Sequence, residues 1–246
     1  MPGLKLWNNK KEKRRRRKKP KRKKLRSNEL KTNQNPPLHH QSHHSFRLLP
    51  QKTITFTLNS LNRLASLLDK VNVSPNALSV ISLLLGLGAG VLFAFNLPLE
   101  GGLLIILCGL FDILDGKVAQ KKNQKSLFGA IFDSTLDRYA EFFIYFGLAF
   151  YYRNHWALWL VVAALFSSFM VSYTRARAEG LGIECRTGVM QRAERILFLS
   201  LGAIIGALTQ IFNLILIPVM GIIFLISTLT AFQRTFHVRK MEKGKK

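Results

Sequence analysis

The sequence predicts an all-α integral membrane protein with six transmembrane helices, preceded by an amphipathic juxtamembrane helix and a disordered polybasic N-terminal tail. Six apolar segments follow residue 75, and each has about the 17–25 residues that a helix needs to cross ~30 Å of hydrocarbon. Basic residues gather on every second connection between these segments. The formal net charge is +24, and 16 of the 37 Lys and Arg residues lie within the first 31 positions. The chain therefore reads as a cationic tail joined to an apolar body, which does not fit a soluble domain.

Residues 1–52 form the predicted tail. Its block of like charge, KKEKRRRRKKPKRKKLR, and its polar stretch NQNPPLHHQSHHS cannot bury enough apolar surface to offset the entropy cost of ordering. Each basic residue near a membrane gains about 1 kcal/mol from anionic lipid headgroups, so we expect the tail to lie on the membrane surface. Nucleic acid is the weaker alternative, because no interleaved aromatic residues and no nucleic-acid-binding motif accompany the charges.

The membrane domain is expected to cover residues 53–240, and residues 241–246 form a short basic C-terminal tail. Within residues 57–71, apolar side chains recur every three or four positions and the opposite face is polar. This spacing predicts an amphipathic helix at the membrane surface. Ser74 and Pro75 follow as a favourable N-cap and first residue of the next helix.

The six apolar segments are predicted to be transmembrane helices over residues 76–95, 101–119, 128–150, 156–174, 195–212 and 214–232. Two aspartates interrupt the second segment, and only TQIFN separates the last two, so one long helix is an alternative there. Three connections hold a single basic residue, Arg153, whereas the other connections and the termini hold nearly all the rest. By the positive-inside rule, both termini and both polar loops are cytoplasmic. We expect a cell inner membrane as the location.

Four aspartates stand at the cytoplasmic ends of the second and third predicted spans. Asp112 and Asp115 are three residues apart, and Asp133 and Asp137 are four apart, so each pair shares one helix face. If these two helices are antiparallel neighbours, both pairs can point to one place. Four carboxylates there repel each other unless a cation separates them, and ligands made only of oxygen suit Mg²⁺ or Mn²⁺.

Two roles other than metal binding could explain these acids: ion pairing and ion-coupled transport. Ion pairs with nearby lysines and with Arg138 do not explain four carboxylates at this spacing inside apolar helices. Ion-coupled transporters also carry intramembrane carboxylates, but their sites tend to lie near the bilayer midplane, whereas these acids lie near one face. Gly116 and Gly129 stand beside the aspartates, where a missing side chain leaves room for a bulky ligand.

The segments DILDGKVAQ and SLFGAIFDSTLD resemble the signature of the CDP-alcohol phosphatidyltransferases, Asp-x2-Asp-Gly-x2-Ala-Arg-x8-Gly-x3-Asp-x3-Asp. The residues in register are Asp112, Asp115, Gly116, Ala119, Gly129, Asp133 and Asp137. Gln120 stands where the family has arginine, a departure that bears on affinity for the CDP-linked substrate, and Lys117 or Lys121 could replace that charge. The resemblance covers about residues 55–240 and leaves out the basic tail.

The resemblance implies an enzyme that moves a phosphatidyl group from CDP-diacylglycerol to an alcohol and releases CMP. It implies two Mg²⁺ or Mn²⁺ ions held by the four aspartates, with Asp137 also acting as general base on the acceptor hydroxyl. The residues implied to bind the CDP-diacylglycerol donor are Pro75, Asn76, Ala77, Leu78, Gly116, Gln120, Ser126 and Gly129. A homodimer is expected from the same resemblance.

Three arginines at cytoplasmic helix ends are candidates to bind the phosphate of the acceptor: Arg175, Arg195 and Arg234. A guanidinium can donate two parallel hydrogen bonds to phosphate oxygens, although the positive-inside bias alone would also place arginines here. The stretches DSTLDRYAE, YTRARAE and QRAER resemble the branch of the family that uses inositol phosphate. Glycerol 3-phosphate, the acceptor of a phosphatidylglycerophosphate synthase, is the alternative.

Overall fold

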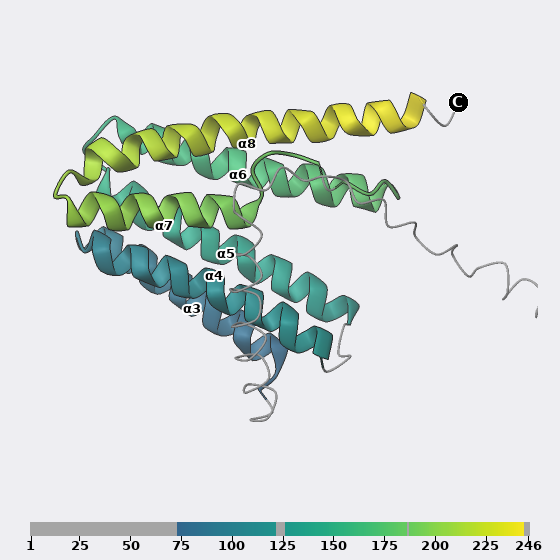
Figure 1. The fold of residues 1–246 in the computed structure, drawn as a ribbon, viewed down its shortest axis with the longest axis horizontal. Coiled ribbons are helices and arrows are strands. Elements are labelled where there is room, and N and C mark those ends of the chain that lie inside the picture. Colours follow the sequence, from purple (N-terminus) through teal and green to yellow (C-terminus); the bar gives the residue numbers. More distant parts are fainter. Residues whose placement is uncertain (1–72, 122–125, 186, 244–246) are drawn as a thin grey trace, which may run out of the picture. The chain divides into compact units, whose positions relative to one another are not determined.

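The computed structural model describes residues 73–121, 126–185 and 187–243, and every regular element in these ranges is a helix (Figure 1). The helices are α3 (Pro75–Ala94), α4 (Pro98–Lys121), α5 (Leu127–Tyr151), α6 (Ala157–Gly180), α7 (Arg192–Leu208) and α8 (Phe212–Lys243). The all-helical prediction is confirmed for this part of the chain. The predicted tail, the amphipathic helix over residues 57–71 and the end of the C-terminal tail lie outside the described residues.

Three helices are long and apolar enough to cross a membrane: α3, α6 and α8. The other three are interrupted by charge or are shorter. Helices α4 and α5 carry the aspartates, and α7 has only 17 residues. The structure therefore supports a membrane protein with three clear candidate spans, and six spans stay a prediction.

Side-chain caps explain why α3 and α5 begin where they do. The Ser74 hydroxyl accepts a hydrogen bond from the backbone N–H of Ala77 at 3.2 Å. The Ser126 hydroxyl accepts one from the N–H of Gly129 at 2.9 Å. Each cap satisfies a backbone donor that has no partner within the helix. Both caps stand at the ends of α3 and α5 that the sequence analysis places in the cytoplasm.

Two separate helices, and not one long helix, form the C-terminal part of the fold. Helix α7 ends at Leu208, and α8 begins at Phe212 after a turn in which Gln210 has a φ of 58°. Helix α8 then continues to Lys243, well beyond the apolar segment that ends near residue 232. Hydropathy marks where the hydrocarbon ends, whereas backbone hydrogen bonding can carry a helix on into water.

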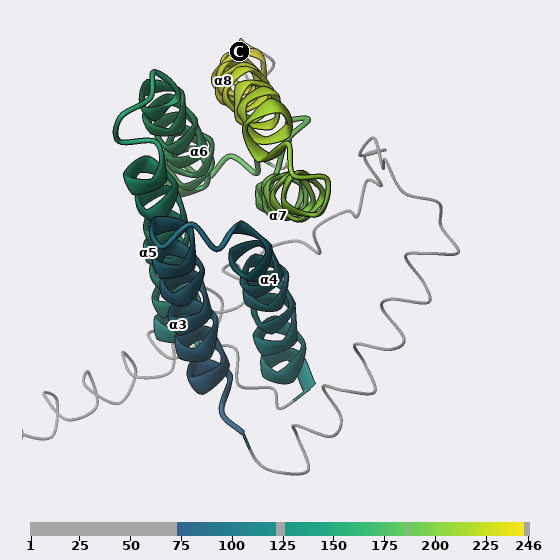
Figure 2. The ribbon, with the colours of Figure 1, turned by 90° about the vertical axis from the view of Figure 1, so that its left-hand side faces the viewer.

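Helix α3 is the central packing partner of the acidic helices. It packs against both α4 and α5, while α4 also packs on α7, α5 on α6, and α8 on both α6 and α7 (Figure 2). Helices α4 and α5 are not among these main pairs in the described part of the chain. The aspartates of α4 and α5 nevertheless converge as expected, and α3 is the main packing neighbour that the two acidic helices share.

Glycines allow the close approach of α3 and α5. A Cβ atom added at Gly90 would lie 2.2 Å from the carbonyl oxygen of Phe143, and one added at Gly147 would lie 2.0 Å from the oxygen of Gly90. Only glycine fits at such a contact. This approach helps to set the position of α5, which carries two of the four aspartates.

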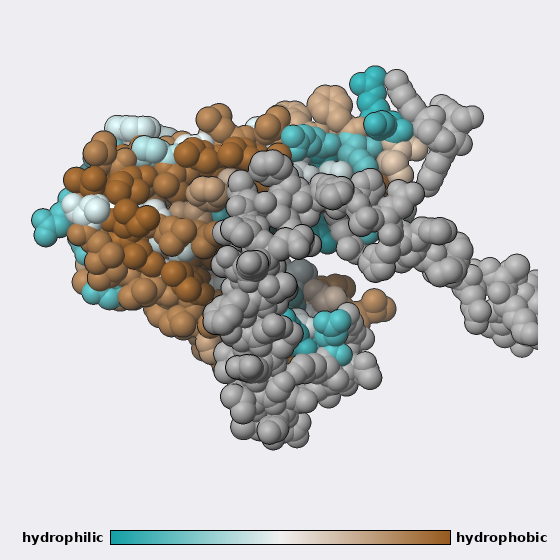
Figure 3. All heavy atoms as spheres, in the orientation of Figure 1, coloured by the Kyte–Doolittle hydropathy of each residue, from teal (hydrophilic) through white to brown (hydrophobic). Residues whose placement is uncertain are grey.

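The visible face of the described helices is apolar over most of its area and polar at one end (Figure 3). Figure 3 shows hydrophobic residues over the part of the visible face that holds the start of α8, and hydrophilic residues near the C-terminal ends of α6 and α8. Large apolar side chains such as Trp159, Leu214 and Leu225 are exposed on the described helices. An apolar exterior of this kind is what lipid contact requires.

Candidate active site

Three of the predicted ligands form one acidic cluster. Asp112 of α4 and Asp133 and Asp137 of α5 each offer a carboxylate oxygen, and these oxygens lie within 4.8 Å of one another. All three residues are partly buried. Among the described residues this is the group of acidic, histidine or cysteine side chains whose geometry suits a metal ion.

Asp115 joins the cluster through a serine of α3. It is only 4% exposed, and its Oδ2 accepts a hydrogen bond from the Ser79 hydroxyl at 2.8 Å. The same hydroxyl lies 3.2 Å from Oδ1 of Asp133. Ser79 therefore ties the acidic residues of α4 to those of α5, and all four predicted aspartates belong to one connected site.

A guanidinium from α7 lies between two of the carboxylates. Nη1 of Arg192 is 2.6 Å from Oδ1 of Asp112 and 2.7 Å from Oδ2 of Asp137. Repulsion between these carboxylates is thereby offset by one positive charge. A position that accepts a cation, with ligands made only of oxygen, fits Mg²⁺ or Mn²⁺.

The residues expected to hold the CDP end of the donor surround the start of α3. Pro75 and Asn76 open this helix, and Oδ1 of Asn76 would lie 3.7 Å from a Cβ atom built on Gly129. A Cβ at Gly116 would meet nothing within 4 Å, so this position faces open space beside Asp115. The structure thus brings the starts of α3 and α5 close together and leaves an opening at Gly116.

Four other residues of that predicted set differ in their surroundings. Leu78 is 1% exposed and packs against apolar residues of α4, so its side chain belongs to a hydrophobic cluster. Ala77 is exposed, and Ser126 serves as the cap of α5. Gln120 is exposed near the end of α4. Of these four, Ala77, Ser126 and Gln120 are exposed, and Leu78 is buried.

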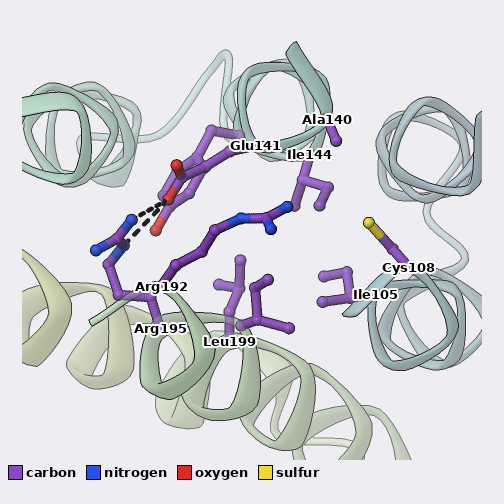
Figure 4. A pocket seen from close by; sticks show the side chains of 10 residues that line it. Ile105, Cys108, Ala140, Glu141, Ile144, Arg192, Arg195 and Leu199 are labelled. Carbon is purple, nitrogen blue, oxygen red and sulfur yellow. Dashed lines mark hydrogen bonds and ion pairs between the residues drawn. The ribbon is translucent and has the colours of Figure 1, made fainter. Parts of the chain in front are cut away.

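The three predicted acceptor arginines have different partners. Arg195 is 2% exposed and pairs with Glu141 of α5, from Nη2 to Oε1 at 3.0 Å (Figure 4). Arg234 donates from Nε to the carbonyl of Thr187 at 2.8 Å and from Nη1 to the carbonyl of Val171.

Arg175 is the accessible member of the three. Its Nε donates to Oε1 of Glu179 at 2.8 Å, and both side chains are 45% exposed. Arg234, in contrast, holds the loop after α6 against α8. This loop comes close because Gly188, at φ 125°, has no side chain to strike Thr230.

Three residues of this site were not predicted as site residues: Ser79, Glu141 and Arg192. A lone serine in an apolar helix has no distinctive sequence pattern. Arg192 and Glu141 stand within the stretches QRAER and DRYAE, so the motif pointed to the right segments but not to these contacts. Their partners on other helices are 36 to 80 residues away in the sequence, which spacing along one helix cannot reveal.

Comparison with known proteins decides the family. The model of the CDP-alcohol phosphatidyltransferase family matches residues 72–233, which include the acidic cluster together with Ser79, Glu141 and Arg192. The chain belongs to this family. The protein is therefore a transferase of phospholipid biosynthesis, and its long apolar helices agree with the membrane location of such enzymes.

Two relatives illustrate the branch. The chain is 36% identical over 140 residues to an archaetidylinositol phosphate synthase of Methanothermobacter thermautotrophicus, covering 57% of this chain and 71% of the relative. It is 34% identical over 152 residues to a phosphatidylinositol phosphate synthase of Mycobacteroides abscessus, covering 58% and 67%.

Solved structures show the same fold. The phosphatidylinositol phosphate synthase of Mycobacterium tuberculosis with CDP-DAG bound superposes with a TM-score of 0.65 at 24% identity, covering 72% of this chain and 92% of that one. A second structure of that enzyme contains manganese and citrate and gives a TM-score of 0.64 at 24% identity, covering 72% and 88%.

Proposed function

We propose that the protein transfers a phosphatidyl group from CDP-diacylglycerol to inositol phosphate, releasing CMP and forming phosphatidylinositol phosphate. The observation that carries this proposal is the position of α7. Arg192 reaches the acidic cluster, and Arg195 lies one turn further along the same helix. A positive group able to bind the phosphate of an acceptor is thereby placed beside the carboxylates. The names of the two relatives support inositol phosphate as that acceptor.

The four aspartates would hold the metal ions of this reaction, two by resemblance to the family. Asp112, Asp133 and Asp137 have oxygens close enough to share an ion, and Asp115 is connected to them by Ser79. When bound there, Mg²⁺ or Mn²⁺ would supply positive charge that offsets the diphosphate of the donor and the negative charge of the departing CMP. Manganese in a structure of a relative supports this choice.

Asp137 would accept the proton of the acceptor hydroxyl. It lies one helical turn after Asp133, and its Oδ2 is 2.7 Å from Nη1 of Arg192. In the proposed reaction the acceptor hydroxyl oxygen forms a bond to the phosphorus of the phosphatidyl group. The bond from that phosphorus to CMP breaks, and the proton of the hydroxyl goes to a carboxylate oxygen of Asp137.

The donor would approach from the start of α3. The open space at Gly116 and the accessible side chains of Asn76 and Gln120 suit a nucleotide diphosphate, whose acyl chains remain in the lipid. Gln120 can donate a hydrogen bond but supplies no charge. Pro75, Ala77, Leu78, Ser126 and Gly129 contribute to this proposed donor site by shaping the two helix starts.

The acceptor phosphate would lie among Arg175, Arg195 and Arg234. Arg195 is the most deeply placed of the three, and Arg175 is the most exposed. Arg234 would take part only if it gave up one of its two backbone carbonyl partners. Phosphate binding is favoured because, among the described residues, Arg175 and Arg195 each pair with one acid only.

Six spans with a cytoplasmic active site complete the proposal. Helices α3 to α8 alternate in direction along the chain, so the starts of α3, α5 and α7 share one side with the ends of α4, α6 and α8 (Figure 1). The sequence has its lysine- and arginine-rich connections at these helix ends, as the positive-inside rule requires of the cytoplasm. We also propose a homodimer and association of the tail with anionic lipids.

One assay tests the function. Purified protein is supplied with CDP-diacylglycerol, Mg²⁺ or Mn²⁺, and either inositol phosphate or glycerol 3-phosphate, and CMP release is measured. We expect release with inositol phosphate. Release with glycerol 3-phosphate alone would instead identify a phosphatidylglycerophosphate synthase, and no CMP with either acceptor would contradict the proposal. Asp137→Asn should abolish CMP release while the melting temperature shows that the fold is retained.

A further inference from the structure

A buried acid on α5 lies outside the metal cluster. Glu141 follows Asp137 by four residues, so it continues the acidic face of α5 one turn further along the helix. It is 6% exposed and does not belong to the group formed by Asp112, Asp133 and Asp137. A carboxylate inside a membrane domain is costly, and the proposed chemistry makes no use of this one.

Both oxygens of Glu141 are engaged by arginines. Oε1 accepts from Nε of Arg195 at 3.1 Å and lies 3.0 Å from Nη2 of the same residue. Oε2 accepts from Nη1 of Arg138 at 2.9 Å. Glu141 is therefore a fully used counter-ion, with no free oxygen for a metal ion in this arrangement.

The contacts between α5 and α7 form two successive charge pairs. Arg192 pairs with Asp137, and one turn further along both helices Arg195 pairs with Glu141. A dication bound by the aspartates would take the place of the Arg192 guanidinium. It would leave the second pair intact, because Glu141 is not one of the clustered aspartates.

One nitrogen of the Arg195 guanidinium is an unused hydrogen-bond donor. Its Nη2 is buried, and no hydrogen bond of acceptable geometry reaches it despite the short distance to Glu141. Arg195 lines a small cavity between α4, α5 and α7 whose other walls include the apolar side chains of Ile105, Ile144 and Leu199 (Figure 4).

We propose that Glu141 is the positioning residue for Arg195. It fixes the guanidinium of Arg195 at the acceptor site and prevents that cation from moving one turn along α5 to the aspartates. Without Glu141, Arg195 would be a buried cation near the clustered carboxylates, and Coulomb attraction at low dielectric would draw it to them. This inference rests on the proposed function, in which Arg195 binds the phosphate of the acceptor.

The ion pairs around Glu141 agree with this role. Arg138, which pairs with Oε2 of Glu141, also has its Nη2 4.0 Å from Oδ2 of Asp137. Among the ion pairs of the described residues, Arg195 pairs with Glu141 alone. The position of the Arg195 guanidinium therefore depends on this one carboxylate.

Glu141→Gln tests the proposal, since glutamine keeps the shape but removes the charge. Initial rates of CMP release are measured while inositol phosphate and CDP-diacylglycerol are varied separately. We expect the KM for inositol phosphate to rise about 10- to 100-fold, the size of effect that follows from a misplaced binding group. The KM for CDP-diacylglycerol should not change. Glu100→Gln, an exposed acid at the opposite end of α4, is the charge-matched control and should behave as wild type.

A double-variant comparison separates positioning from a structural role. If Glu141 acts through Arg195, then Glu141→Gln should add nothing to the acceptor KM of a variant that already carries Arg195→Gln. Additive effects, or equal changes in both KM values, would overturn the proposal. Should Glu141→Gln not fold, Glu141→Asp preserves the charge with a shorter reach, and it must then raise the acceptor KM alone.

The wild-type assay distinguishes this inference from the proposed function. If wild-type protein releases CMP with glycerol 3-phosphate and not with inositol phosphate, the acceptor assignment fails. The coupling of Glu141 and Arg195 is then measured with glycerol 3-phosphate, which also carries a phosphate. Non-additivity with that acceptor supports the positioning role, and additivity overturns it.

Discussion

Replacing Ser79 with alanine should weaken metal binding although serine is not a metal ligand in the proposed site. Its hydroxyl lies 2.8 Å from Asp115 and 3.2 Å from Asp133, on two different helices. One hydroxyl proton serves one of these carboxylates at a time, and a hydrogen bond to a charged group contributes about 1.5–3 kcal/mol. Losing such a group beside metal ligands costs about 10- to 100-fold in metal affinity. We therefore expect the Kd for Mn²⁺ to rise by that factor in Ser79→Ala.

The measurement is Mn²⁺ binding to purified protein, followed by the paramagnetic signal of the free ion. Ser82→Ala is a matched control, because Ser82 is equally buried one turn further along α3. Its hydroxyl donates at 3.0 Å to the backbone carbonyl of Cys108 and not to an acid. This control should bind Mn²⁺ as wild type does. Equal Kd values for Ser79→Ala and Ser82→Ala would refute the argument that α3 organises the carboxylates.

Three further predictions concern the cation between the carboxylates, the helix packing and the tail. Arg192→Gln should lower the melting temperature in EDTA, because the two carboxylates that the guanidinium bridges then repel each other. Added Mn²⁺ should raise the melting temperature of this variant more than that of wild type. Equal shifts of the melting temperature in both proteins would contradict the bridging role. Gly90→Ala should destabilise the fold by about 1–3 kcal/mol through overpacking against α5, whereas Gly221→Ala, whose Cβ meets nothing within 4 Å, should leave the melting temperature unchanged. Deleting residues 1–45 should leave CMP release in detergent largely intact, and complete loss of activity would show that the tail is part of the catalytic unit.

The helices were predictable because hydropathy and capping are local properties of the sequence. Helix α3 was expected over residues 76–95 and runs over Pro75–Ala94, and Ser74 caps it as expected. The main error was at the end of α8, where a polar extension remains helical beyond the apolar segment. Hydropathy detects segments that contact lipid, and it does not detect helical turns that continue beyond the lipid.

The acidic ligands could also be predicted from the sequence. Spacings of three and four residues place carboxylates on one face of a helix whatever that helix packs against. Asp112, Asp133 and Asp137 do converge, with oxygens within 4.8 Å of one another. The acceptor arginines were harder, because an arginine near a cytoplasmic helix end satisfies the positive-inside rule whether or not it binds phosphate.

By itself, the sequence determined that this chain is helical, which segments are apolar and which acids share a helix face, since each of these depends on residues within a few turns of one another. Only the tertiary structure decided that α3 lies against both acidic helices and that Ser79 joins their carboxylates. It also decided that, on α7, Arg192 pairs with Asp137 and Arg195 pairs with Glu141. Those contacts link residues 36 to 55 positions apart. Their formation depends on which helices pack together and how closely glycines let them approach, and no pattern along a single helix records that.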